Sequence, residues 1–406
     1  KKEVYEYLKT KSGKELPWGI LTGIRPAKIP LRLMMQGQEE AAIWDILKEE
    51  YFCRDDKVKL AMDVAKKEFS LTQGMQHERC ANVYIGIPFC PTICAYCSFS
   101  SFPAGRYRDK MDAYLDALEK EMTQCKEWLA GKQMVSVYVG GGTPTSLSEE
   151  QFERLMAMTE KYLPMEQSKE FTVEAGRPDS ITEGKLRSMK THGVTRISIN
   201  PQSMKEHTLE LLGRKHTVEE IREKFMLART LGFDNINMDL IAGLPEETLE
   251  DFKETLREVE ALKPDSITVH TLVIKRASRL RKEQLEQGGE MREEDACIEP
   301  MQKEAEQFCR VHGYEPYYMY RQKNKAHTTR NTNQENVAYA KPGKECLYNI
   351  FIMEELQSIL ALGSGGSSKI VFPEENRMER VENVKSVDDY IGRIDEMIRR
   401  KKESWR

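Results

Sequence analysis

Short apolar runs alternate with longer amphipathic stretches from residue 82 onward. The β-rich runs are 82–88, 134–140, 170–175, 194–200, 234–240 and 266–272. The stretches between them predict helices at 109–130, 148–163, 180–191, 217–232 and 246–262. Six strand–helix units in series predict a parallel α/β sheet with right-handed crossovers, either doubly wound or rolled towards a barrel. Because six units fall short of the eight in a closed barrel, we expect a partial (β/α)6 barrel.

The two flanks of this region have different patterns. Residues 1–78 predict a helical N-terminal extension, with a loop at 21–30, and residues 79–275 hold the predicted barrel. Residues 276–406 predict a mixed α/β C-terminal extension. Its expected elements are a helix at 290–312, a short strand at 314–320, a loop through 322–344, a helix at 345–361, a glycine-rich stretch at 362–372 and a helix near 386–404.

Composition narrows the class of protein. The chain has 406 residues, of which 39% are hydrophobic, so it can bury a sizeable core. The 62 basic and 66 acidic residues leave a net charge of −4, which gives no overall attraction for nucleic acid or for an anionic membrane. No apolar run approaches the roughly 18 residues of a spanning helix, and the start lacks the apolar segment of a signal peptide. We therefore expect a cytoplasmic protein that neither binds nucleic acid nor spans a membrane.

Three of the nine cysteines lie close together, at Cys90, Cys94 and Cys97. The other six are scattered without the spacing of a disulfide framework, which is typical of small buried side chains. The three clustered thiols follow a predicted strand, and their spacing can bring them to one point only from an irregular loop. They are a chance grouping, a structural zinc site or an iron–sulfur site. Structural zinc normally has four protein ligands, whereas three thiolates on a cubane leave one iron open, so iron is the better fit.

The cysteine loop, with Tyr96 before the third cysteine, resembles the signature of radical S-adenosylmethionine (SAM) enzymes. Further matching segments are "GGGTPT" at 140–145, "VEAGRPDSI" at 173–181, "RISINPQSM" at 196–204 and "LLGRKHT" at 211–217. The resemblance implies that Cys90, Cys94 and Cys97 bind a [4Fe–4S] cluster and that SAM fills the open iron position. It also implies a set of residues around SAM and the cluster: Tyr84, Gly141, Gly142, Thr143, Glu174, Gln202, Arg214, Asp239 and Thr271.

The segment "NMDLIAGLPEET" at 237–248 resembles one branch of that superfamily, the oxygen-independent coproporphyrinogen III dehydrogenases and their relatives. The long N-terminus with "LTGIRPAK" and the later "AYAKPGKEC" look most like the HemZ-type members. The resemblance implies oxidative decarboxylation of two propionates of a tetrapyrrole, coproporphyrinogen III, with an electron donor such as a flavodoxin or ferredoxin. Tyr84 and Arg321 are the expected catalytic residues, Arg321 as a propionate anchor with Arg25 as the alternative.

Two other functions occur in the same branch and stay open at this point. One is a heme-binding trafficking protein, and the other is a radical enzyme that methylates heme or opens its ring. The heme-chaperone members carry His-Asn-x-x-Tyr-Trp in their C-terminal part. The nearest stretch here, residues 335–340, reads "ENVAYA" and lacks both the histidine and the tryptophan.

Overall fold

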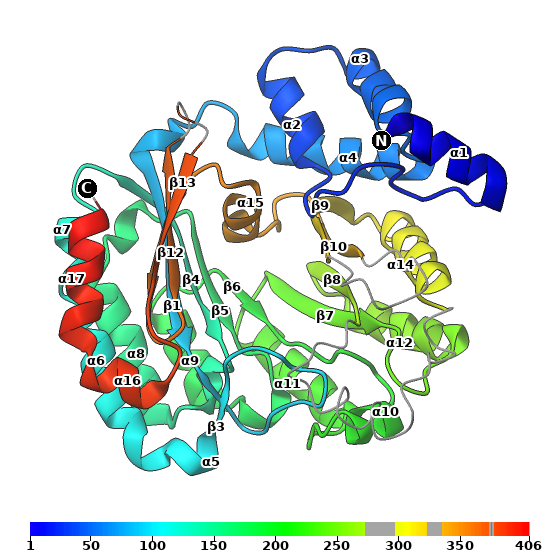
Figure 1. Cartoon of the computed structure of the whole chain (residues 1–406). Helices are drawn as coiled ribbons and strands as arrows, with labels where there is room; N and C mark the ends of the chain where they lie inside the picture. The colour runs from blue at the N-terminus through cyan, green and yellow to red at the C-terminus, as the bar shows by residue number, and fades with distance from the viewer. Residues whose placement is uncertain (273–296, 323–334, 373–374, 376, 406) are drawn as a thin grey trace.

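The computed structural model describes residues 1–272, 297–322, 335–372, 375 and 377–405, and it contains a strongly curved sheet of eleven strands (Figure 1). Six strands run parallel and in chain order through the middle of the sheet: β1 (Cys80–Ile87), β4 (Gln133–Gly141), β5 (Glu170–Glu174), β6 (Arg196–Ser198), β7 (Ile236–Ala242) and β8 (Ser266–Thr271). Most of their residues are buried, as expected for parallel strands covered on both faces. The predicted open barrel of six parallel strands is confirmed.

Helices cover the convex face of this sheet (Figure 1). They are α6 (Met111–Met122), α7 (Cys125–Trp128), α8 (Glu149–Tyr162), α9 (Glu183–Thr191), α10 (Glu206–Leu211), α11 (Val218–Thr230) and α12 (Leu249–Leu262). Three of them begin at capping boxes, in which a serine or threonine hydroxyl and a side chain three residues later satisfy free backbone amides. The residues that start these helices are Ser148, Thr217 and Thr248.

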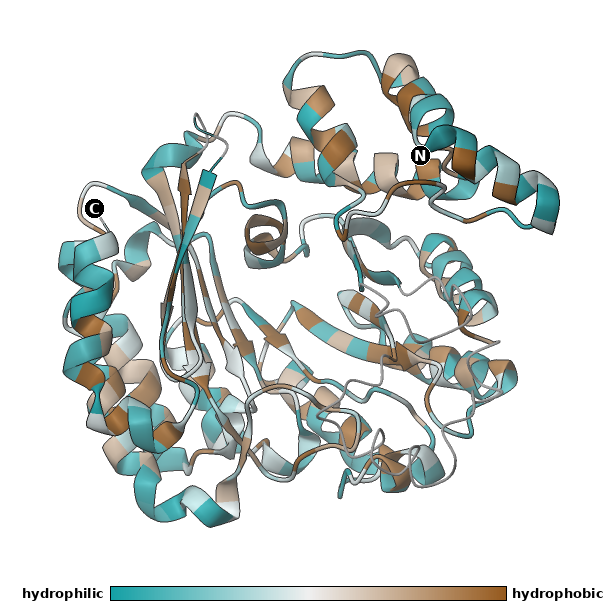
Figure 2. Cartoon of the chain, in the orientation of Figure 1, coloured by the Kyte–Doolittle hydropathy of each residue, from teal (hydrophilic) through white to brown (hydrophobic). Residues whose placement is uncertain are grey.

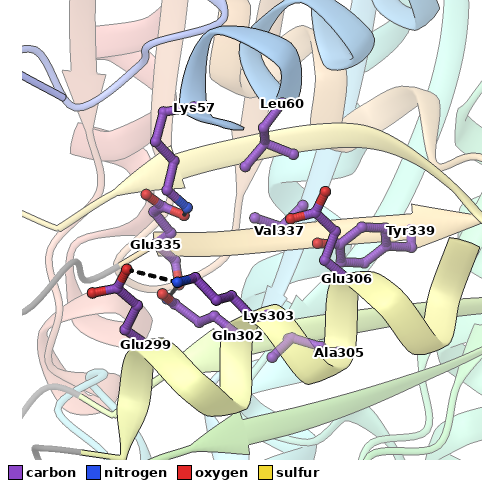
Figure 3. A pocket seen from close by; sticks show the side chains of 11 residues that line it. Lys57, Leu60, Glu299, Gln302, Lys303, Ala305, Glu306, Glu335, Val337 and Tyr339 are labelled. Carbon is purple, nitrogen blue, oxygen red and sulfur yellow. Dashed lines mark hydrogen bonds and ion pairs between the residues drawn. The ribbon is translucent and has the colours of Figure 1, made fainter. Parts of the chain in front are cut away.

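The N-terminal extension is helical, as predicted. It consists of α1 (Lys2–Ser12), α2 (Lys28–Met35), α3 (Glu40–Asp45), a π-helical turn at Ile46–Glu50 and α4 (Asp55–Thr72). Figure 3 shows how α4 meets the sheet: Lys57 reaches Glu335 of strand β10 (Glu335–Ala340), with 2.7 Å between Nζ and Oε2. This buried ion pair fixes the N-terminal extension to the sheet. Beside it, between α4, β10 and helix α14 (Ile298–Val311), lies a cavity of about 20 Å³, enough for about one water molecule.

The C-terminal part adds strands to both edges of the barrel sheet. On the β8 side, β10 pairs antiparallel with β8 and with β9 (Glu315–Arg321). On the β1 side, β11 (Ser358–Leu362) pairs parallel with β1, and β12 (Ser367–Phe372) and β13 (Arg377–Glu382) follow antiparallel. Helices α16 (Val387–Gly392) and α17 (Ile394–Ser404) then pack beside α6 (Figure 1). The predicted final helix is thus two helices.

Two predictions for the C-terminal part are wrong. The end of the predicted loop at 322–344 forms β10, and the predicted helix at 345–361 is only α15 (Leu347–Glu354) followed by β11. Glu355 has a φ of 54°, a left-handed conformation that ends the helix before the apolar run "SILAL". Residues 323–334 of the predicted loop lie outside the described residues. Residues 290–296 of the predicted helix at 290–312 also lie outside them, and the rest of that helix is confirmed as α14.

Helix α15 lies on the concave side of the sheet and is mostly apolar, apart from Asn349 and the buried Glu354 at its end (Figure 2). Its Tyr348, Ile350 and Phe351 are buried, and it packs against β4 and β9. An apolar helix thus fills the barrel interior towards the amino ends of the parallel strands, which leaves the carboxyl ends for a site.

Candidate active site

A cavity of about 630 Å³ lies at the carboxyl ends of the parallel strands. Parallel α/β sheets place their sites at this edge, and a typical small-molecule site holds roughly 300–1,000 Å³. All the residues that the sequence predicts for the cluster and for SAM line this cavity: Tyr84, Cys90, Cys94, Cys97, Gly141, Gly142, Thr143, Glu174, Gln202, Arg214, Asp239 and Thr271. Residues spread over almost 190 positions of the chain thus meet in one place.

The cysteine loop is irregular, as its spacing predicts. Cys90 ends the short strand β2 (Phe89–Cys90), which pairs with β3 (Phe102–Pro103), and residues 91–101 between them form no helix or strand. The loop is held from the opposite side of the cavity, where Ala95 N donates to Leu212 O at 3.0 Å. The three clustered thiols are partly exposed, whereas five of the other six cysteines are buried. The loop therefore presents its thiols to the cavity.

Two side chains donate hydrogen bonds to these thiols. Thr143 Oγ1 lies 3.6 Å from Cys90 Sγ, and Arg177 Nη1 lies 3.7 Å from Cys94 Sγ. Burial raises the pKa of the Cys90 thiol to about 11, although the hydrogen bond from Thr143 opposes the shift. A partly buried thiol of this kind ionises far more readily beside a positive charge, which a bound iron ion would supply.

The glycine run at the end of β4 lets three segments of the chain approach one another. A Cβ on Gly142 would lie 2.6 Å from Phe89 O and 3.0 Å from Cys90 Sγ, and a Cβ on Gly140 would lie 2.8 Å from Cδ of Glu174. Gly141 has a φ of 112°, a conformation that side chains rarely allow. Only glycines fit between the cysteine loop and Glu174, so their amides can reach a bound ligand.

Glu174 ends β5 at the wall of the cavity, and burial raises the pKa of its carboxyl to about 7. Tyr138 opposes this shift by donating its hydroxyl to Oε1 at 2.5 Å. The Tyr138 ring in turn stacks on Tyr348 and Tyr84, with centroids 4.6 and 6.3 Å away. A cationic ligand beside Glu174 would lower its pKa and hold the carboxyl ionised.

Asp239 of β7 lies beside Gln202, which follows β6 and forms an isolated bridge to Leu240 of β7. Burial alone would raise the pKa of Asp239, but hydrogen bonds from His270 and Asn237 and the charge of His270 lower it, so this carboxylate is ionised. Gln202 has a φ of 70° and is joined to β7 by its amide, which donates to Asp239 O at 2.9 Å. Its Oε1 is buried and has no partner among the described residues. A strained backbone and an unsatisfied side-chain oxygen are features of ligand sites.

Arg214 crosses beneath the cysteine loop. Its guanidinium donates to Asn200 O at 2.5 Å and to the hydroxyl of Tyr96 at 3.3 Å. Thr271, at the end of β8, donates its hydroxyl to Glu335 O at 2.6 Å. Both side chains thus line the cavity while being held by protein groups.

Arg321 is not among the residues that line this cavity. Its Nη1 donates to Leu21 O at 2.8 Å, its amide donates to Ile24 O, and its guanidinium lies over the Trp18 ring. The side chain thus holds the N-terminal loop against β9. The alternative anchor Arg25 is paired with Glu355, with 2.5 Å between Nη1 and Oε2. The structure brings neither arginine to the cysteines.

The cavity suits an iron–sulfur cluster better than a single metal ion. In the described part of the chain, no group of three or more His, Cys, Asp or Glu side chains is arranged to hold one ion. A cubane binds each thiolate through a different iron, so its ligands stand further apart than those of a single ion. Three thiols on one irregular loop, two hydrogen-bond donors to them and the unsatisfied oxygen of Gln202 fit a cluster with a polar ligand beside it.

Some residues that line the cavity were not predicted from the sequence. His270 comes from β8, Tyr320 lies in β9 and Gln322 directly follows it, and Ser364 and Lys385 come from later in the C-terminal part. The signal for Ser364 is the glycine-rich run at 363–366, which marks a tight loop directly after β11. No sequence pattern points to Lys385.

Comparison with known proteins agrees with this geometry. The sequence model of the Radical SAM superfamily matches residues 84–259. The oxygen-independent coproporphyrinogen-III oxidase-like protein HemZ of Bacillus subtilis is 40% identical over 392 residues, which cover 96% of this chain and 77% of that protein. The heme chaperone HemW of the same organism is 38% identical over 194 residues, 48% of this chain and 50% of that protein.

Among solved structures, coproporphyrinogen III oxidase (HemN) from Escherichia coli is similar, with a TM-score of 0.61, 24% identity and coverage of 81% of this chain and 72% of that chain. The fold and the site thus define a radical SAM protein, a class whose members bind a [4Fe–4S] cluster and SAM. Within that class, the chain belongs to the family of the HemZ-type, oxygen-independent coproporphyrinogen-III oxidase-like proteins. None of the described helices is long and apolar enough to cross a membrane.

Proposed function

We propose that this protein is an oxygen-independent coproporphyrinogen III dehydrogenase. It converts two propionate side chains of the tetrapyrrole to vinyl groups and yields protoporphyrinogen IX. Each conversion releases CO₂, gives one hydrogen atom to SAM and passes one further electron to an external acceptor. The observation that carries the proposal is the meeting of the three thiols, the glycine run and the carboxylates Glu174 and Asp239 around one cavity. The relationship over nearly the whole chain to a coproporphyrinogen oxidase-like protein supports the choice of substrate.

In this proposal the thiols of Cys90, Cys94 and Cys97 hold the cluster. Three carboxylate or amide side chains, those of Glu174, Gln202 and Asp239, bind and orient SAM together with the amides of Gly141 and Gly142 and the side chains of Thr143, Arg214 and Thr271. When bound, the cluster and SAM supply the one-electron chemistry that removes a hydrogen atom from the substrate.

Tyr84 forms part of the cavity wall, and its ring stacks beside those of Tyr138 and Tyr348. This aromatic wall keeps water from the side of the cavity that faces the barrel interior. An external electron donor such as a flavodoxin or ferredoxin reduces the cluster. Arg321 takes no part in catalysis, because its guanidinium is engaged by the N-terminal loop.

A heme-trafficking function is the second candidate, and the 38% identity to a heme chaperone favours it. The stretch at 335–340, where chaperones of this branch carry histidine and tryptophan, is the buried strand β10 here. Glu335 is paired with Lys57, and Asn336 Oδ1 accepts a hydrogen bond from Thr271 N at 2.9 Å. This stretch therefore offers no imidazole to a heme iron, which favours the dehydrogenase.

Turnover under anaerobic conditions tests the proposal. The protein is reconstituted with iron and sulfide, reduced, and supplied with SAM and coproporphyrinogen III, and the tetrapyrrole product is identified by mass. We expect 5′-deoxyadenosine, methionine and protoporphyrinogen IX, and none of them from Cys94→Ala. Tight heme binding without release of 5′-deoxyadenosine would support trafficking instead. A methylated or ring-opened product from heme would assign the radical chemistry to heme.

A further inference from the structure

Among the described residues that line the cavity, one basic side chain is not engaged by the protein. Within the described part of the chain, the lysine and arginine side chains that line it are three: Arg177, Arg214 and Lys385. Arg177 forms a two-point ion pair with Asp179, at 2.9 and 2.7 Å, and Arg214 donates to backbone carbonyls. Lys385 is exposed at the cavity, and within the described ranges it has neither an ion pair nor a hydrogen bond from its ammonium group. Its charge is therefore free for a ligand.

Backbone hydrogen bonds hold the segment that carries Lys385 in place. The segment 383–385 lies along the glycine-rich loop that follows β11: Gly365 N donates to Val384 O at 2.7 Å, and Asn383 N donates to Gly366 O at 2.8 Å. The stem of Lys385 passes over this loop, since its Cγ lies 3.9 Å from where a Cβ on Gly365 would be. The loop and the lysine thus form one unit at the cavity wall.

A buried charged network, the loop anchor, holds this unit from below. Its members are Glu121 of α6, Lys401 of α17, Asn383 and Tyr390, and the two charged side chains are fully buried and in contact. Glu121 Oε2 accepts from Gly363 N at 2.9 Å and from the Tyr390 hydroxyl at 2.7 Å. Lys401 Nζ donates to Asn383 Oδ1 at 2.6 Å.

Each charged group of the loop anchor has hydrogen-bond partners, so the network fixes the position of the loop. Burying charges is costly, and such a network is seldom the most stable way to fill a core. A network of this kind is suited to holding a functional loop in one geometry.

The second polar group of this unit is Ser364, which lies between Gly363 and Gly365. The residue is 9% exposed, lines the cavity, and its Oγ has no partner among the described residues. A buried hydroxyl without a partner costs free energy unless a ligand satisfies it. An ammonium group and a hydroxyl held by two hydrogen-bonded backbone segments are complementary to a carboxylate.

We propose that Lys385 and Ser364 form a subsite for a carboxylate of the substrate. The proposal rests on the proposed function, whose substrate carries four propionates. It places one propionate at the end of the cavity next to β1 and β11, in contact with a part of the chain outside the six strand–helix units. The carboxylates Glu174 and Asp239 repel a propionate from their part of the cavity. Attraction at the subsite and repulsion by these carboxylates together favour one orientation of the substrate in the cavity.

Binding of coproporphyrin III tests the subsite without turnover, because this oxidised tetracarboxylate is stable in air. Quenching of its fluorescence is titrated with the cluster-loaded protein, for the wild type and for Lys385→Gln. Loss of one partly exposed charge pair should weaken binding about fivefold. Ser364→Ala should weaken it by a similar factor, and Lys385→Arg should retain most of the affinity. Lys126→Gln, at an exposed lysine of α7 that does not line the cavity, should bind like the wild type.

SAM binding and the visible absorption of the cluster serve as readouts of an intact site and should be unchanged in Lys385→Gln. Raising the salt concentration should reduce the difference between the wild type and Lys385→Gln, since the pair is partly exposed. Equal affinity of both proteins for coproporphyrin III would overturn the subsite and leave the proposed function standing. A wild-type protein that does not bind coproporphyrin III would overturn both.

Discussion

The ion pair between Glu121 and Lys401 allows a quantitative test of the loop anchor. Both side chains are 0% exposed, and the carboxylate also accepts hydrogen bonds from a backbone amide, a tyrosine hydroxyl and the amide of Asn383. In Lys401→Met the buried carboxylate loses its counter-charge. Breaking a buried pair in this way typically costs about 3–5 kcal/mol. For a protein whose stability is of the usual order of 5–15 kcal/mol, that loss is large.

The neighbouring residue provides a matched control. Lys402 is 62% exposed and lies 3.4 Å from Glu127, itself 60% exposed. Exposed pairs contribute about 0–1 kcal/mol, so Lys402→Met should change stability by less than about 1 kcal/mol. In the double variant Glu121→Leu/Lys401→Met no charge remains buried, and stability should recover in part. Full recovery is not expected, because Gly363 N and the side chain of Asn383 lose their partners.

The assay is urea unfolding followed by tryptophan fluorescence and by circular dichroism, with coproporphyrin III binding measured on the same samples in the absence of urea. We expect Lys401→Met to lower the unfolding midpoint strongly and Lys402→Met to leave it nearly unchanged. Equal midpoints for the two single variants would refute the argument that the buried pair holds this region. A double variant less stable than Lys401→Met would show that the uncompensated charge is not the main cost.

Three further predictions concern the cavity and the barrel interior. Cys94→Ala should abolish the visible absorption of the reconstituted cluster, whereas Cys80→Ala, which removes a buried thiol of β1, should retain it. Asp239→Ala should reduce the affinity for SAM about tenfold or more, because a hydrogen bond to a carboxylate contributes on the order of 1.5–3 kcal/mol. Calorimetry measures this affinity, and an unchanged value would contradict the role of Asp239 in binding SAM. Burial raises the pKa of Glu354 from 4.5 to about 7, so the folded state keeps a proton that the unfolded state releases, and stability should fall as pH rises from 4.5 to 7. In Glu354→Gln, the free energy of unfolding measured with urea should fall by up to about 3 kcal/mol less between pH 4.5 and 7 than in the wild type. The same pH dependence in both proteins would disprove the raised pKa of Glu354.

The central sheet could be predicted because its strands are short apolar runs separated by long amphipathic helices. The polar residues of the site could be predicted as a set because several lie at or soon after a strand end, and parallel strands bring these ends to one edge. Glu174 ends β5, for example, whereas Asp239 lies in the middle of β7, two strands further along the sheet. The family resemblance supplied the roles expected of these residues, which spacing alone could not.

The errors arise where long-range contacts decide the outcome. The run "SILAL" is apolar at four of five positions, and periodicity cannot separate a short buried strand from the end of a helix. Pairing with β1, far earlier in the chain, decides in favour of a strand. Likewise, the direction of the Arg321 side chain depends on a carbonyl of Leu21, some 300 residues away, which no local pattern reveals.

The pairing of β1 with β11 also affects the order in which the protein folds. The first strand of the barrel joins Ala81 to Ser358, so its outer edge stays without a partner until nearly the whole chain has been synthesised. Contacts between such distant segments form slowly, and an unpaired apolar strand can pair with other chains. Until β11 arrives, a nascent chain exposes β1 as a site for aggregation, although the other central strands can already assemble. Variants shortened from the C-terminus into β11 should therefore aggregate even though every predicted cluster ligand is present.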